Sequence, residues 1–161
     1  MNNSIRYKGD YRGLIVIYRV IYRINNINMK NRPIIDTYST MYPVNIVVCN
    51  KYVTLKDIRK RYTYYDGTEI SDISNTYDAI TIKCKNKKDN INCILIYHIS
   101  DFGNNKEYIN NRLKTIVHEC SHVVMFTYEL IGEDICLEQQ EPFAYYMEYI
   151  FDCVLKTLNK K

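Results

Sequence analysis

One short run in the sequence has residue types and spacing that could bind a metal ion and act on a substrate: His118-Glu119-Cys120-Ser121-His122. It lies in an apolar segment with helical periodicity, and side chains four residues apart share one face of a helix. The imidazoles of His118 and His122 should therefore point the same way and could bind one Zn²⁺. Glu119 is adjacent to the first ligand, where a carboxylate can act as a general base toward water. The run predicts a zinc site with a catalytic carboxylate.

The alternative is that two of the three His in the chain lie together by accident on a surface helix. Cys120 stands inside the run, but it lies about 160° around the helix from each of the two His. We therefore expect Cys120 to face the core and to take no part in the chemistry.

Two helices and a hairpin are needed to position this run. We expect a helix over residues 106–131, ended by Gly132, and a last helix over residues 142–158 that begins near Glu141. Alternating apolar residues predict two strands, at about 80–85 and 91–99, which pair as an antiparallel hairpin before the first helix. Cys84 and Cys93 would face each other across it, as two buried thiols or as a disulfide.

The first 77 residues are expected to be β-rich, and the sequence assigns them no role. Apolar runs predict strands at 14–23 and 44–49, and Thr54 is a candidate N-cap for a helix over 55–62. The segment from 68 to 78 is polar and reads as a loop. We expect a single α+β domain over 1–161, in which a small antiparallel or mixed sheet packs against the His-bearing helix and the C-terminal helix.

Composition excludes several classes of protein. The chain has 47% hydrophobic and 25% charged residues, which is typical of a globular domain rather than a disordered chain. Its net charge of +4 comes from basic residues scattered along the sequence, so the sequence gives no support for a nucleic acid partner. The six Cys form no C-x-x-C pair, and we expect them to be reduced. No targeting or membrane segment is recognisable, which predicts a cytoplasmic protein, of the producing or host cell.

A catalytic zinc site needs a third protein ligand and a group that stabilises the oxyanion. Glu138 and Glu141 lie near the start of the last helix, where a short link would bring them back toward the His pair; both stay open, with Glu141 favoured. Tyr145, four residues beyond Glu141 on the same helical face, is a candidate oxyanion stabiliser or a packing residue. His98 on the second hairpin strand is a weaker candidate for the same role.

The order of these motifs resembles a known family. A strand with Ile94-Leu95-Ile96-Tyr97-His98 precedes the His118–His122 run, and Glu141-Pro142-Phe143-Ala144-Tyr145 follows it. This is similar to the small zincin-like metallopeptidases of phages and prophages, with H-E-x-x-H followed by E-x-x-A-Y, and the resemblance covers roughly residues 78 to 155. It implies a zincin-like fold, Zn²⁺ held by His118, His122 and Glu141, and Glu119 as the base that helps water to hydrolyse a peptide bond.

Two other functions stay open from the sequence. The chain could be a virus- or prophage-encoded binding or inhibitor protein that keeps a structural or vestigial zinc site. An N-terminal β-rich interaction module, residues 11 to 50, could instead do the main work. Under each of these functions the expected partner is a peptide or protein, which the sequence does not specify further.

Overall fold

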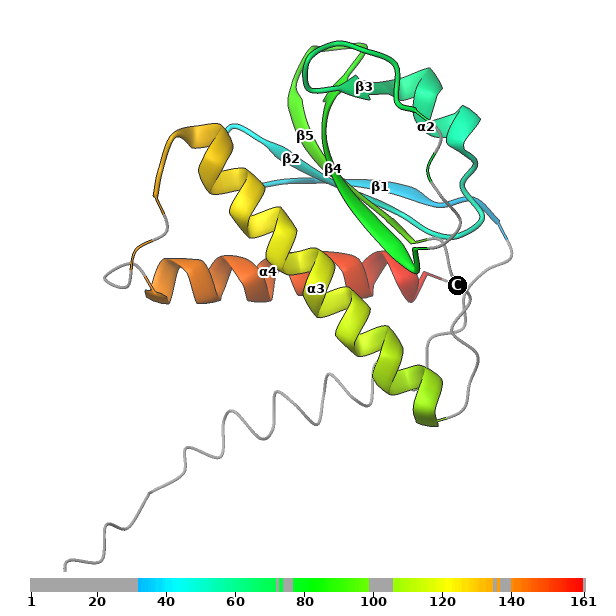
Figure 1. Ribbon diagram of the computed structural model, residues 1–161, viewed down its shortest axis with the longest axis vertical. Helices are drawn as coiled ribbons and strands as arrows, with labels where there is room; N and C mark the ends of the chain where they lie inside the picture. The colour runs from blue at the N-terminus through cyan, green and yellow to red at the C-terminus, as the bar shows by residue number, and fades with distance from the viewer. Residues whose placement is uncertain are drawn as a thin grey trace, which may run out of the picture.

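The computed structural model describes residues 32–71, 73, 77–98, 106–134, 136 and 140–160, with side chains from residue 110 onward in the first long helix. A five-stranded mixed sheet in the order β1-β2-β5-β4-β3 forms the centre of this part of the chain. Two long helices, α3 (Lys106–Ile131) and α4 (Gln140–Leu158), cross each other against one face of the sheet, and the short α2 (Leu55–Arg61) lies at its other side (Figure 1). The class is therefore α+β with a mixed sheet, as the sequence predicted.

The middle of the sheet is apolar on both faces. β2 (Asn45–Cys49) runs parallel to β5 (Asn92–His98), and four consecutive residues are fully buried in the first strand. Ile46, Val48, Ile94 and Ile96 pack under α3 and α4. The alternate residues, including Val47 and Leu95, form a second core with Ile58 of α2. Burial on both faces explains why these strands read as continuous apolar runs.

The predicted hairpin is present. β4 (Ala79–Asn86) pairs antiparallel with β5, and the register sets Cys84 opposite Cys93. Both Cys are buried free thiols, as is Cys49. The disulfide alternative is thus not what this structure contains.

The edges of the sheet were harder to predict. β1 (Ile35–Ser39) pairs with β2, and the three-residue β3 (Tyr62–Tyr64) pairs with β4; neither strand was expected. The residues of β1 are half-buried or exposed and β3 has only three residues, so neither sequence shows the apolar alternation that identifies a strand. The strand expected at 14–23 lies outside the described residues.

Helix α2 (Leu55–Arg61) begins as predicted. The Thr54 hydroxyl accepts a hydrogen bond from the Asp57 N–H at 3.2 Å, and the Asp57 carboxylate accepts one from the Thr54 N–H at 3.2 Å. This reciprocal capping box satisfies two backbone donors at the helix start.

Helix α3 (Lys106–Ile131) carries the His run and ends at Gly132, whose φ of 74° is the left-handed conformation that glycine adopts at no steric cost. α4 (Gln140–Leu158) returns beside it. The core face of α3 is buried at Ile116, Cys120, Val123, Val124 and Thr127, whereas Val117 is 45% exposed. In the described part of the chain, no helix is long and apolar enough to cross a membrane.

Candidate metal centre and its surroundings

The structure brings His118 and His122 together on the outer side of α3. Their Nε2 atoms are 3.1 Å apart, and the rings meet edge to face with centroids 4.7 Å apart. His118 is exposed and His122 is half-buried, so both nitrogens can be reached from solvent. The His122 ring also stacks on Phe126, one turn further along, at 5.8 Å and an interplanar angle of 25°. This contact limits the rotamers open to His122.

The separation of the two Nε2 atoms fits a metal ion. Two nitrogens bound to tetrahedral zinc at about 2.0–2.1 Å lie about 3.3–3.4 Å from each other. The observed 3.1 Å is close to this value and is also short enough for a hydrogen bond between a donor and an acceptor nitrogen. This spacing would allow the two nitrogens to bind one ion as two of its ligands.

The Glu119 side chain, next to the His pair in the sequence, points toward strand β4. Its side chain is 6% exposed, and its Oε2 accepts a hydrogen bond from the Thr81 hydroxyl of β4 at 2.5 Å. The same hydroxyl lies 3.4 Å from the Glu119 carbonyl oxygen. Thr81 therefore fixes the carboxylate between α3 and β4.

A hollow of about 350 Å³ joins these groups. Helix α3 lines it with Lys114, Thr115, His118 and Glu119, and the segment that leads into β4 lines it with Tyr77, Asp78 and Ala79. One predicted ligand and the predicted base thus open into the same space. Thr81 and Asp78 were not expected at the site. Thr81 is one of the alternating polar positions of β4, with Lys83 and Lys85, so the sequence did not distinguish it from them.

The start of α4 lies elsewhere. Phe143 packs against the Tyr128 ring at 6.4 Å, and the Tyr146 hydroxyl is 3.0 Å from that of Thr127. Thr127 and Tyr128 together point about 150° around α3 from the mean direction of the two His. α4 therefore packs on the side of α3 opposite the His pair.

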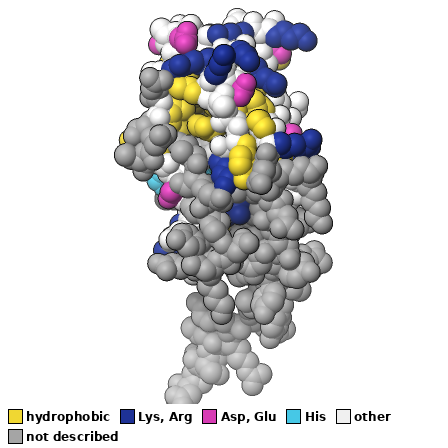
Figure 2. All heavy atoms as spheres, turned by 90° about the vertical axis from the view of Figure 1, so that its right-hand side faces the viewer, with side chains coloured by type: hydrophobic (Ala, Val, Ile, Leu, Met, Phe, Trp, Pro, Cys, Tyr) yellow, Lys and Arg dark blue, Asp and Glu magenta, His cyan; other side chains and the backbone are white. Residues whose placement is uncertain are grey.

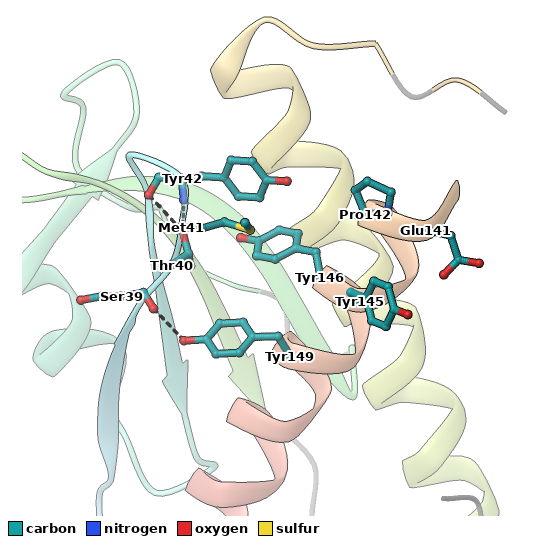
Figure 3. A pocket seen from close by; sticks show the side chains of 9 residues that line it. All are labelled: Ser39, Thr40, Met41, Tyr42, Glu141, Pro142, Tyr145, Tyr146 and Tyr149. Atoms are coloured by element: carbon teal, nitrogen blue, oxygen red, sulfur yellow. Dashed lines mark hydrogen bonds between the residues drawn. The ribbon is translucent and has the colours of Figure 1, made fainter. Parts of the chain in front are cut away.

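Glu141 and Tyr145 accordingly line a different groove. This groove of about 610 Å³ lies between α4 and the connection from β1 to β2, and Tyr42, Tyr146 and Tyr149 contribute to it. Figure 3 shows the Glu141 carboxylate pointing away from these rings. The structure does not bring Glu141 or Tyr145 to the His pair, so the roles that the resemblance and the spacing suggested for them stay predictions.

No group of three His, Cys, Asp or Glu that could hold a metal occurs among the residues that the structure describes. Glu138, the other candidate ligand, lies outside them. Of the predicted site residues, the structure brings together His118, His122 and the neighbouring Glu119.

His98 is buried near the same end of the sheet. Its side chain is 3% exposed, and its Nε2 makes no hydrogen bond in the described structure. Burial, and then the charge of the nearby Arg112, lower the pKa of His98 to about 3. His98 does not line the His118 hollow, so its role as an oxyanion stabiliser stays a prediction.

Cys120 lies in the core between α3 and α4, where we expected it. Burial raises the pKa of its thiol, and the neighbouring Glu119 charge adds to this effect. The thiol therefore stays protonated and does not compete for a metal ion at neutral pH.

Comparisons with known proteins add no assignment. No protein-family model, curated protein or solved structure matches the chain.

Proposed function

We propose that the chain is a zinc-dependent metallopeptidase with a zincin-like arrangement, in which His118 and His122 bind the metal ion and Glu119 is the general base. The observation that carries the proposal is the convergence of the two Nε2 atoms, 3.1 Å apart, next to a carboxylate that opens into the same hollow. A helix with this run, packed against a mixed sheet, supports the zincin-like assignment.

Zinc in such a site lowers the pKa of water and polarises a carbonyl oxygen. Glu119 then has two tasks: its carboxylate takes a proton from the attacking water and returns it to the leaving amine. Both tasks need the carboxylate to be held beside the scissile bond. Thr81 supplies that constraint, because its hydroxyl occupies one oxygen of Glu119 and leaves the other for the substrate side.

The experiment compares wild type with Glu119→Gln. Both proteins are purified without chelator, their metal content is measured, and both are incubated with an unfolded protein such as casein and with a peptide library. A peptidase predicts about one zinc per chain in each protein and cleavage by wild type only. Cleavage by both proteins would show that Glu119 is not the base.

The third ligand is tested separately. Glu141→Ala is compared with Glu148→Ala, an exposed carboxylate on the same helix that no part of the proposal uses. Loss of zinc affinity in the first variant alone would assign Glu141 and would require α4 to move relative to α3. Equal affinity in both variants would remove Glu141 from the site, and Glu138→Ala is then the next variant to measure.

A binding or inhibitor protein with a structural zinc is the second candidate. The groove between α4 and the β1–β2 connection favours it, because its rim exposes Met41 at 85% and Tyr145 at 67%. Exposed aromatic and methionine side chains at a groove are typical of protein-binding surfaces. Zinc binding without cleavage by either wild type or Glu119→Gln would support this function over the first.

A further inference from the structure

Strand β1 is an edge strand whose outer side carries unpaired backbone groups. Among the described strands, only β2 pairs with it. The Asn50 N–H donates to the Ile34 carbonyl oxygen at 3.1 Å, and residue pairs that exchange hydrogen bonds alternate along an antiparallel ladder with pairs that do not. The register therefore turns the N–H and C=O groups of Ile35, Thr37 and Ser39 away from β2.

Most of these outward groups are available to another chain. The Ser39 carbonyl oxygen accepts a hydrogen bond from the Tyr149 hydroxyl of α4 at 2.6 Å (Figure 3). No hydrogen bond joins the backbone of Ile35 or Thr37 to a described residue outside the sheet. Thr37 and Ser39 are exposed, so solvent reaches this edge. Open N–H and C=O groups in strand register are a template for a further extended chain.

A cluster of cations lies beside the middle of this edge. Thr37 lines a hollow of about 510 Å³, together with exposed basic side chains from α2 and from the connection between β4 and β5: Lys60, Arg61, Lys87 and Lys88. No Asp or Glu of the described chain lines it, and the Lys87 N–H donates to the Arg61 carbonyl oxygen at 2.8 Å, which holds the two segments together. Figure 2 shows Lys and Arg side chains gathered at the end of the molecule where Figure 1 places α2 and β3. A carboxylate opposite Thr37 would meet this positive charge.

The same strand ends at the apolar groove described above. Ser39 and Met41 line one side of the groove, and tyrosines of α4 line the other (Figure 3). Glu141 is the only charged residue in its described lining, so the groove favours a large apolar side chain. Thr37 and Ser39 are two residues apart, or about 7 Å along a strand. One short peptide could therefore reach both the cations and the groove.

These three features together select the kind of partner. A row of strand-spaced backbone donors and acceptors matches another extended polypeptide, whereas a nucleic acid or a small anion offers no such ladder. The cations favour Asp or Glu in that peptide, and the groove favours an aromatic or large aliphatic residue nearby. A second copy of this chain fits less well, because antiparallel pairing of two β1 strands about Thr37 would bring two cationic hollows together.

We propose that the outer edge of β1 binds an extended peptide of a partner protein, with an acidic side chain at the cationic hollow and an apolar side chain in the groove. This interaction is independent of the peptidase proposal, because neither hollow shares a residue with the hollow beside His118. It also names a partner for the groove that favours a binding function.

The test selects nine-residue peptides from a display library on wild-type protein, with chelator present so that the proposed metal site takes no part. Selected sequences should be enriched in Asp or Glu two to four residues from an aromatic or large aliphatic residue. A selected peptide is then labelled with fluorescein and its binding is measured by anisotropy. Lys60→Gln/Arg61→Gln should weaken binding about 5-fold at 50 mM salt and less at 500 mM, and Tyr145→Ala should weaken it about 10-fold.

Matched controls remove the same groups elsewhere. Lys114→Gln/Lys156→Gln changes two exposed positions on α3 and α4, and Tyr65→Ala removes a ring that is 41% exposed outside the groove. Both controls should bind the peptide like wild type. An equal loss in the controls, or selected sequences without the acidic and apolar pair, would overturn the proposal.

Backbone pairing is tested on both partners. Thr37→Pro removes an N–H that points away from β2, so the fold should persist by circular dichroism while binding falls about 10-fold; Thr37→Val keeps the N–H and should bind normally. Methylation of alternate amide nitrogens in the peptide should abolish binding for one alternate set and be tolerated for the other, because only one edge of the peptide faces β1. Equal effects of the two methylated sets, or full binding by Thr37→Pro, would show that no strand is added and would overturn the proposal.

Discussion

The hydrogen bond between Thr81 and Glu119 gives the sharpest prediction about the site. The Glu119 side chain is 6% exposed, and the Thr81 hydroxyl donates to its Oε2 at 2.5 Å. A hydrogen bond to a charged, buried group contributes about 1.5–3 kcal/mol. Thr81→Val keeps the shape of the side chain and removes the donor, so it should lower the free energy of unfolding by about 1.5–3 kcal/mol.

Urea unfolding followed by circular dichroism, with chelator present, measures this change without a contribution from bound metal. Thr81→Ser keeps the hydroxyl and should recover most of the loss. In a Glu119→Gln background the acceptor is neutral, and Thr81→Val should then cost only about 0.5–1.5 kcal/mol. A cost below about 0.5 kcal/mol in the wild-type background, or the same cost in both backgrounds, would refute the idea that Thr81 holds a buried carboxylate.

Two further predictions concern the fold. The lowered pKa of His98, about 3 compared with about 6.5 in an unfolded chain, means that the unfolded state binds more protons between these values. The free energy of unfolding should therefore fall as the pH decreases below about 6.5, and His98 should account for up to about 1.4 kcal/mol per pH unit. Urea unfolding of His98→Gln at several pH values should show a shallower dependence of the unfolding free energy on pH. Gly132→Ala should lower the free energy of unfolding by about 1–2 kcal/mol, because Gly132 has a left-handed φ of 74°. No atom lies within 4 Å of the added Cβ, so the cost comes from the backbone conformation alone. An unchanged melting curve would contradict this.

Much of the architecture could be predicted from local sequence signals. The capping box at Thr54 and Asp57, the long amphipathic helix and the left-handed Gly132 are each determined by neighbouring residues. Sheet edges are different, because β1 and β3 depend on partners that are distant in the chain. Their sequences carry no strong period, and they were missed.

In the candidate site, too, the sequence predicted what neighbouring residues determine and missed what tertiary contacts determine. The i, i+4 spacing was enough to predict that His118 and His122 face one way, because both are on one helix. The placement of Glu141 depends on how α4 packs against α3, and side-chain contacts such as Phe143 with Tyr128 determine that packing. Likewise, the burial of Glu119 against Thr81 and the meeting of Arg61 with Lys87 arise from tertiary contacts that no local pattern contains.

The central claim is that His118 and His122 together bind one zinc ion. Its most direct test is titration of zinc into chelator-treated protein by calorimetry, in a Cys136→Ser background that removes the exposed thiol. We expect about one zinc per chain, and loss of this binding in both His118→Ala and His122→Ala, while the fold is retained because neither side chain is in the core. Unchanged zinc binding in either variant, or none in the parent protein, would contradict the account.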